Sequence, residues 1–289
     1  MTAPLFHLAP GSLDLAAVGV RLTLDGAEGH HAATVMRLGP GESIDLSDTG
    51  RIRVAGVVVA AAEGGLEIEV RTVQEHPAPH PELVLVQALA KDRRDLQAVE
   101  TAVELGVDRI VPWQAERSVA RWKPGREAKK HQEWVHTVRA AAKQSRRTGV
   151  PAVEALQSTA QLLDSLIEDA ASTRADSNDA DSTGAAETAV LVLHEEAEAS
   201  LCEASRQLGL IPEPWRGPRR VLLVVGPEGG ISPEERQRLT EAGAVSAVLG
   251  PHVLRTSTAG PAALSALQLL LGRWDAAPGD HSTEPTAVD

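Results

Sequence analysis

The hydrophobic pattern of the chain changes near residue 80. Before that point, apolar and polar residues alternate in short segments at 42–48, 51–60 and 66–73, which is typical of half-buried β-strands. One helical segment, at 30–38, interrupts them. Residues 1–75 are therefore predicted to form a small β-barrel or sandwich.

A proline-rich segment at 76–81 follows. Proline has no amide donor, so this segment cannot continue a strand ladder or a helix and is interpreted as a linker. Beyond it, helical segments such as 95–105, closed by Gly106, alternate with short apolar runs rich in β-branched residues. These runs lie at 83–89, 109–112, 189–194, 221–226 and 244–250. Such runs are typical of parallel strands buried on both faces, so residues 81–274 are predicted to form an α/β domain.

Size and composition agree with two globular domains. The chain has 289 residues, of which 43% are hydrophobic and 24% are charged, and no segment approaches the roughly 20 apolar residues that a membrane-spanning helix needs. The first residues lack the basic and apolar regions of a secretory signal, which favours a cytoplasmic protein. Cys202 is the only cysteine, which excludes an internal disulfide and a zinc site built on several thiolates.

The net charge of −12 hides an uneven distribution. Residues 164–187 and the tail at 275–289 contribute −6 and −4, whereas residues 117–147 hold ten Lys or Arg against two Glu. A local charge of +8 in 31 residues indicates a surface that faces an anion. The segment at 171–187 lacks large apolar residues and is predicted to be a disordered insertion, and the tail is similar.

The clearest local motif lies at 221–239, where a buried strand leads into the sequence GPEGG. Ser232, Pro233 and Glu235 then form a helix start with an N-cap hydroxyl, a proline at the first position and a capping-box glutamate. In a parallel sheet, ligands bind beyond the carboxyl ends of strands, and glycines let a ligand approach the backbone. The loop lacks the lysine of a P-loop, so a ligand without phosphates is predicted; a tight turn without a ligand is the alternative.

A second strand ends at Leu249 and Gly250, and a long apolar helix begins near Ser257 or Thr258. Between them lies Arg255, whose positive charge at a helix N-terminus gains nothing for the helix. That position favours a role toward a ligand or substrate. The two strand-end loops are expected to line one pocket.

Taken together, these motifs resemble those of the RsmE family, bacterial 16S ribosomal RNA uracil-N3 methyltransferases of the SPOUT superfamily. The resemblance covers nearly the whole chain. It rests on GPEGGIS from Gly226, LG at 249–250 with LRT at 254–256, ELGV at 104–107, ERS at 116–118, QS at 144–145 with Arg147, and on His31, the MRL of 36–38 and Gly41. Two positions depart from the family pattern, because Lys143 and Ser257 stand where similar proteins often have Glu.

The resemblance implies a PUA-like RNA-binding barrel followed by a SPOUT α/β domain with a trefoil knot. It also implies a homodimer that binds S-adenosylmethionine and acts on 16S ribosomal RNA, within the small ribosomal subunit. By carry-over, the cofactor-binding residues are Leu193, His194, Glu195, Gly226, Pro227, Glu228, Gly229, Gly230, Leu249, Gly250, Leu254 and Thr256.

The basic segment supplies the candidate RNA-binding residues, with Arg37 in the first domain. They are Arg37, Arg117, Arg121, Trp122, Arg146 and Arg147. Trp122 lies between two cations and suits base stacking, whereas Trp134 is assigned to a helix and to the core. A solvated helix face is the alternative for the arginines. No metal site is predicted, because no histidine pair has metal-binding spacing.

Methyl transfer needs few protein groups, because the sulfonium already carries an activated methyl group. Methylation of uracil N3 requires loss of a proton, and a guanidinium would stabilise the resulting anion. Arg255 is the candidate for this catalytic role. Two alternatives stay open at this point, ribose 2′-O methylation by a related SPOUT enzyme and a non-catalytic RNA-binding protein in ribosome assembly.

Overall fold

The computed structural model describes residues 3–62, 64–176, 188–211 and 218–275. It divides into two compact units. The first comprises residues 1–78 and 142–150, and the second comprises 79–141 and 151–289. The division near residue 78 falls within the proline-rich segment. Residues 142–150 differ from the expectation, since the sequence pattern assigned them to the α/β domain.

The first unit is a curled five-stranded sheet in the order β1-β3-β4-β5-β2. Its strands are β1 (Leu5–His7), β2 (Arg21–Leu24), β3 (Ser43–Ser47), β4 (Ile52–Ala62) and β5 (Gly65–Glu75). The ladder of β1 with β3 is parallel and the others are antiparallel. No ladder joins β1 to β2 among the described residues. The sheet is therefore a half-barrel, and the prediction of a small β-barrel holds only in part.

The helical segment expected at 30–38 lies earlier in the sequence and is less regular. Helix α1 (Gly26–His30) passes into a single π-helical turn at His31–Val35. Arg37 then takes a left-handed conformation with a φ of 58°, which ends the helix because a side chain is strained there.

Residues 142–150 complete this unit from a distance in sequence. The Ser47 hydroxyl donates to the carbonyl of Thr148 at 2.6 Å, and the Val150 amide donates to the carbonyl of Thr49 at 3.1 Å. The ammonium of Lys143 lies 2.8 Å from the carboxylate of Glu28. Lys143 is thus paired with an acid of the half-barrel.

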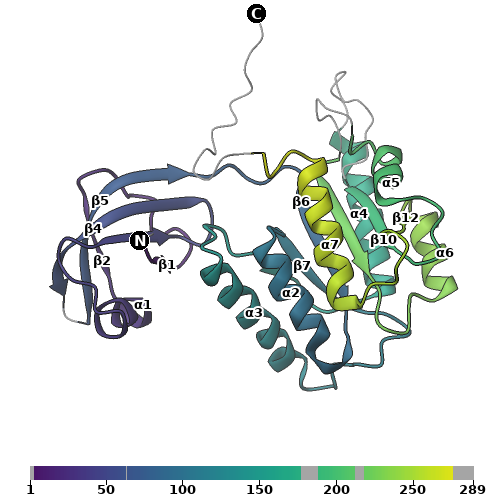
Figure 1. The fold of residues 1–289 in the computed structure, drawn as a ribbon, viewed down its shortest axis with the longest axis horizontal. Coiled ribbons are helices and arrows are strands. Elements are labelled where there is room, and N and C mark those ends of the chain that lie inside the picture. Colours follow the sequence, from purple (N-terminus) through teal and green to yellow (C-terminus); the bar gives the residue numbers. More distant parts are fainter. Residues whose placement is uncertain (1–2, 63, 177–187, 212–217, 276–289) are drawn as a thin grey trace, which may run out of the picture. The chain divides into compact units, whose positions relative to one another are not determined.

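The second unit is built on a parallel seven-stranded sheet in the order β12-β10-β11-β6-β7-β8, with β9 also paired to β7 (Figure 1). The strands are β6 (Glu82–Ala88), β7 (Arg109–Gln114), β8 (Ala152–Val153), β9 (Gln157–Ser158), β10 (Thr188–Leu193), β11 (Arg220–Val225) and β12 (Val245–Ala247). All five predicted apolar runs form strands of this sheet. The side chains of these strands, among them Val86, Val192 and Val224, form the hydrophobic core of the second unit.

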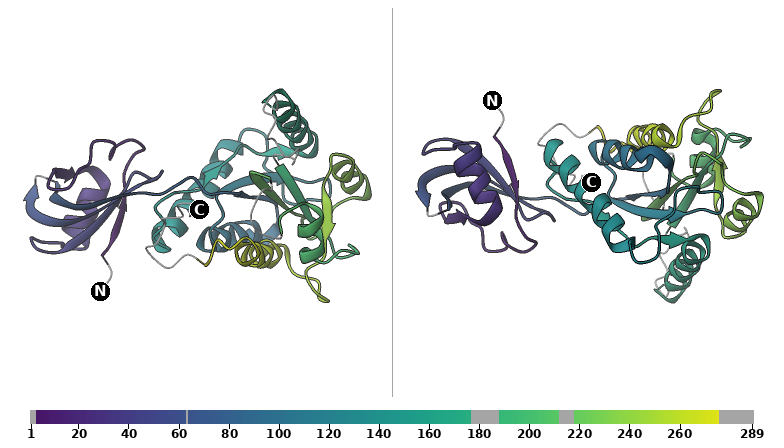
Figure 2. Two further views of the ribbon diagram at one scale, coloured as in Figure 1. Left: turned by 90° about the horizontal axis from the view of Figure 1, so that it is seen from above. Right: turned by 90° about the horizontal axis from the view of Figure 1, so that it is seen from below.

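Helices cover both faces of this sheet (Figure 2). They are α2 (Arg94–Glu104), α3 (Glu127–Gln144), α4 (Thr159–Asp176), α5 (Leu201–Gln207), α6 (Pro233–Glu241) and α7 (Thr256–Leu270), and a 3-10 turn, η2, spans Lys91–Arg93. Helix α7 packs against α2, β6 and β11. No helix in the described ranges is long and apolar enough to span a membrane.

The predicted disordered insertion at 171–187 needs a correction. Residues 171–176 continue helix α4, in keeping with the high helix propensity of their alanines. Residues 177–187 lie outside the described residues, as does the tail from 276 onward.

Candidate functional site

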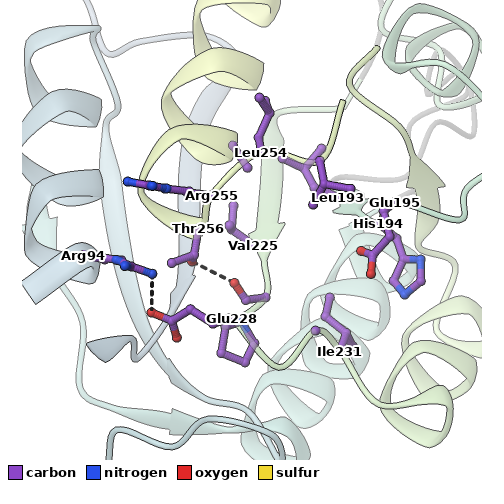
Figure 3. Close-up of a pocket in the computed structure, with 15 residues that line it drawn as sticks. Arg94, Leu193, His194, Glu195, Val225, Glu228, Ile231, Leu254, Arg255 and Thr256 are labelled. Atoms are coloured by element: carbon purple, nitrogen blue, oxygen red, sulfur yellow. Dashed lines mark hydrogen bonds and ion pairs between the residues drawn. The ribbon is translucent and has the colours of Figure 1, made fainter. Parts of the chain in front are cut away.

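A pocket of about 280 Å³ opens at the carboxyl ends of β10 and β11 in the second unit. Three loops line it: the residues after β10, the GPEGG loop after β11, and the loop that leads from β12 into α7 (Figure 3). Because β10 lies between β11 and β12 in the sheet, these strand ends are neighbours. The pocket thus lies where parallel sheets bind ligands.

The structure brings most of the predicted cofactor-binding residues into this region. The pocket lining includes Leu193, His194, Glu195, Gly226, Pro227, Glu228, Gly230, Leu254 and Thr256, and also Arg255. Leu249 lines a smaller adjoining cavity of about 70 Å³. Gly229 and Gly250 line neither cavity.

Gly229 has another role. A Cβ atom at this position would lie 3.0 Å from the carbonyl oxygen of Arg117, so Gly229 allows the GPEGG loop to pack against the segment after β7. The Arg117 guanidinium also reaches the Gly229 carbonyl at 3.5 Å. A side chain at Gly229 would therefore displace the loop before it reached a ligand.

Helix α6 begins as the sequence predicts and anchors the GPEGG loop. The Ser232 hydroxyl accepts from the amide of Glu235, and the Glu235 carboxylate accepts from the amide of Ser232 in return. The fully buried Glu235 also accepts from the Glu116 amide at 2.9 Å and from the Thr159 hydroxyl. The loop is thereby tied to β7 and to the start of α4.

Thr256 connects the pocket walls. Its hydroxyl donates to the Gly226 carbonyl at 2.8 Å and accepts from the Gln87 side-chain amide at 2.9 Å. This chain of hydrogen bonds joins β6, the GPEGG loop and the first turn of α7. Gln87 is fully buried, and sequence reasoning did not identify it.

We expect Thr256→Val to weaken binding of S-adenosylmethionine about tenfold. Valine keeps the volume but removes both hydrogen bonds, and a buried polar group left without a partner costs about 1–3 kcal/mol. Titration calorimetry measures the change. Thr258→Val is the matched control, because Thr258 is exposed in the same helical turn; an equal loss in both variants would contradict a role for the Thr256 hydroxyl.

Arg255 is the N-cap residue of α7 but does not cap it with its side chain. Its carbonyl accepts from the amides of Thr258 and Ala259, while its exposed guanidinium forms no ion pair within the described ranges. Arg255 therefore presents an uncompensated positive charge at the pocket. Ser257, one of the two family departures, is buried in the first turn of the same helix.

Arg94, at the start of α2, is a pocket residue that the sequence interpretation missed. It follows the strand β6, whose carboxyl end adjoins that of β11, so the same strand-end rule could have found it. Figure 3 shows Arg94 and Arg255 on one side of the pocket and His194 and Glu195 on the other. Arg94 lies 3.7 Å from the carboxylate of Glu228.

The chemistry of the lining fits S-adenosylmethionine. Apolar walls from Leu193, Val225 and Ile231 suit an adenosine, and two acids face two arginines around the pocket. A balanced set of charges suits a zwitterionic amino acid and a sulfonium better than a phosphate. The volume is near the lower end of the range of roughly 300–1,000 Å³ for ligand pockets.

The candidate RNA-binding residues fall on both units. Arg37, Arg146 and Arg147 belong to the first unit, and Arg117, Arg121 and Trp122 belong to the second. Arg37, Arg117, Arg121 and Arg146 are exposed, whereas Arg147 is half-buried. The predicted basic segment is thus divided between two bodies.

The two tryptophans of that segment pack together. Trp134 is buried in the core, as predicted. Trp122 is half-buried and meets Trp134 edge to face, with ring centroids 6.0 Å apart. In the parts that the structure describes, no group of three or more His, Cys, Asp or Glu side chains could hold a metal ion.

Comparison with known proteins identifies both units. Residues 76–268 match the family described as an RNA methyltransferase domain, and residues 24–71 match the RNA methyltransferase PUA domain. The chain is 42% identical over 282 residues to Ribosomal RNA small subunit methyltransferase E of Mycobacterium tuberculosis, covering 97% of both chains. It is 28% identical to the Bacillus subtilis protein of the same name, over 85% of this chain and 88% of that one.

Solved structures agree with this assignment. The chain resembles a Ribosomal RNA small subunit methyltransferase E from Neisseria gonorrhoeae, solved bound to S-adenosyl methionine, with a TM-score of 0.71 and 26% identity over 93% of this chain and 98% of that chain. A putative methyltransferase from Legionella pneumophila, in complex with the same cofactor, gives a TM-score of 0.69 and 25% identity over 93% and 98% of the two chains. The half-barrel is therefore a PUA domain, the second unit is a SPOUT-like methyltransferase domain, and the chain belongs to the ribosomal RNA small subunit methyltransferase E family.

Proposed function

We propose that this protein methylates N3 of a specific uridine in 16S ribosomal RNA of the small subunit, using S-adenosylmethionine. The observation that carries the proposal is the pocket at the ends of β10 and β11, whose lining contains the residues that the family resemblance assigns to the cofactor. The proposed substrate follows from membership of the ribosomal RNA small subunit methyltransferase E family. We also propose a cytoplasmic location, which a substrate in the small ribosomal subunit supports.

The residues around the pocket have different proposed roles. Leu193, Val225 and Ile231 supply apolar walls, and the GPEGG loop brings its backbone to the ligand. When bound, S-adenosylmethionine supplies an activated methyl group. The chain's own contribution is to hold the base in position and to control charge around it.

Arg255 is the proposed catalytic residue. Loss of the N3 proton leaves a negative charge shared by O2, N3 and O4 of the uracil, and a guanidinium at the pocket stabilises that charge. The exposed and unpaired state of the Arg255 side chain within the described ranges supports this role. The backbone of Arg255 is fixed at the N-terminus of α7. Its guanidinium is therefore held near the pocket and keeps its positive charge.

We also propose that the C-terminal part of the second unit forms a trefoil knot. Strand β12 lies at one edge of the sheet, and the chain then returns past β10 so that α7 packs on β11, β6 and α2. This path would carry the loop between β12 and α7 across the loops that follow β10 and β11. Knotted connections are rare, so pattern alone does not predict them.

We also propose that the protein forms a homodimer, as the family resemblance implies. Val253 in the loop before α7 and Leu269 near the end of that helix are exposed by 80% and 61%. Burial of these two side chains against a second copy of the chain would remove their apolar surface from water. The proposed RNA-binding residues remain Arg37, Arg117, Arg121, Trp122, Arg146 and Arg147. The guanidinium groups of the five arginines suit phosphate contacts, and the indole of Trp122 suits base stacking.

Mapping of modified nucleosides tests the function. We expect 16S ribosomal RNA from a strain that lacks this gene to lose one 3-methyluridine, and the wild-type gene to restore it. An Arg255→Ala gene should not restore it. Loss of a 2′-O-methyl nucleoside would instead favour ribose methylation, and an unchanged set of nucleosides would favour a non-catalytic RNA-binding protein.

A further inference from the structure

The turn η2 between β6 and α2 directly precedes the pocket residue Arg94 and has a strained backbone. Asp92 and Arg93 are consecutive residues with φ of 54° and 58°, a left-handed conformation that costs a non-glycine residue about 1–2 kcal/mol. Such strain persists only where the surroundings hold the backbone, and it is often found at functional sites.

Two carboxylates hold this turn. The Asp95 carboxylate accepts from the Ala90 amide at 3.3 Å, and the Glu228 carboxylate accepts from the Lys91 amide at 3.2 Å. Burial raises the pKa of Asp95, and the charge of Glu228 adds to that increase. Since Glu228 belongs to the GPEGG loop, the turn is fixed relative to the pocket.

The held turn displays positive charge. Lys91 and Arg93 are exposed, and neither forms an ion pair in the part of the chain that the structure describes. Arg94, the next residue, is half-buried and faces Glu228. Packing does not explain a strained backbone that exposes two cations, because neither side chain contributes to the core.

Basic residues of helix α3 add to the positive charge of the turn. The Lys130 ammonium lies 2.8 Å from the Glu133 carboxylate, and this contact lowers the pKa of Glu133. The charges of Arg93 and Lys129 lower it further, so these groups lie near the same carboxylate. We define the turn patch as Lys91, Arg93, Lys129 and Lys130.

The turn patch lies beside the cofactor pocket, because the Lys91 amide bonds to the pocket residue Glu228 and Arg94 lines the pocket. The target base must reach the methyl group at this pocket while it stays attached to its backbone, so the flanking phosphates must pass over the pocket rim. Cations on that rim suit phosphate oxygens, which carry most contacts between proteins and nucleic acids. None of the four patch residues belongs to the set of candidate RNA-binding residues named in the sequence analysis.

We propose that the turn patch binds the phosphate backbone of the substrate RNA next to the target nucleotide, and that Glu228 is a positioning residue that fixes the patch relative to the cofactor pocket. This inference rests on the proposed function, because it takes RNA as the substrate. The alternative is that the four side chains of the patch contact only water, in which case they would contribute nothing to RNA affinity.

Salt-dependent RNA binding tests the patch. For the double variant Arg93→Ala with Lys129→Ala, we expect the slope of log affinity against log salt toward transcribed 16S ribosomal RNA to decrease in magnitude by about 1.5, since each lost phosphate contact removes about 0.7–0.9. That change corresponds to about thirtyfold weaker binding at roughly 0.1 M salt. Affinity for S-adenosylmethionine, measured by calorimetry, should stay unchanged.

The control removes the same charge elsewhere. Arg206 and Arg238 are exposed on α5 and α6, so Arg206→Ala with Arg238→Ala should keep the wild-type slope. Equal slopes for the patch variant and the wild type would overturn the inference, as would an equal loss in the control. If the wild type itself neither binds nor methylates the RNA, the proposed function fails instead.

Limited proteolysis tests the part assigned to Glu228. In Glu228→Ala the Lys91 amide loses its acceptor, so trypsin should cleave after Lys91 or Arg93 faster than in the wild type. Glu234→Ala is the control, because Glu234 is exposed on α6 and contacts neither the turn nor the pocket. Equal cleavage rates in Glu228→Ala and the wild type would overturn the positioning role.

Discussion

Arg255→Lys is expected to lower the single-turnover rate of methyl transfer about a hundredfold, equivalent to roughly 3 kcal/mol of transition-state stabilisation. Lysine keeps the positive charge but loses the planar fork of the guanidinium, which can donate two hydrogen bonds in a fixed geometry to the uracil anion. The helix should be unaffected, because only the backbone of Arg255 caps α7.

The measurement is single-turnover methyl transfer to unmodified small ribosomal subunits at saturating S-adenosylmethionine, with cofactor affinity determined by calorimetry. Arg238→Lys, at an exposed position on α6, is the control and should behave as the wild type. A near-normal rate would show that the Arg255 side chain has no role in chemistry. Weakened cofactor binding with a normal rate would make Arg255 a cofactor ligand instead.

The largest effect on stability is expected from Glu235→Ala. The Glu235 side chain is fully buried and accepts from the Glu116 amide, the Ser232 amide and the Thr159 hydroxyl. Truncation leaves these donors without an acceptor at a buried position, so the free energy of unfolding should fall by about 3 kcal/mol. The GPEGG loop would lose its anchor at the same time.

Denaturant unfolding monitored by tryptophan fluorescence measures this change, since Trp113 donates to Thr159 at 3.1 Å within the same network. Glu234→Ala, one residue earlier on the exposed face of α6, should stay within about 0.5 kcal/mol of the wild type. A similar small change in Glu235→Ala would mean that water or a neighbouring group replaces the lost acceptor.

Local patterns predicted the secondary structure around the pocket well. The start of α6 follows from Ser232, Pro233 and Glu235, because capping depends on residues within one turn and their side chains bond to nearby amides. The five apolar runs became parallel strands because a strand buried on both faces needs apolar residues at every position. The helix at 30–38 was less predictable, since the backbone turns left-handed at Arg37.

Other features depend on contacts between distant parts of the sequence. Residues 142–150 join the half-barrel through Ser47 and Thr49, and no local pattern records a pairing across about a hundred residues. Gly229 looks like a ligand-facing glycine in the sequence, yet its open side meets Arg117. The order of strands decided the position of Arg94 at the pocket.

By itself, the sequence determined the two-part organisation, the parallel strands, the capped start of α6 and the motifs of the methyltransferase family, because each depends on residues close together in the chain or on their order. Only the tertiary structure decided which strand ends meet, that Thr256 joins Gln87 to Gly226, and that Glu228 holds the turn at Lys91. Those contacts span between 30 and 169 residues of sequence. They form because the sheet places β6 beside β11 and α7 against both, an arrangement that burial of the whole core selects rather than any single segment.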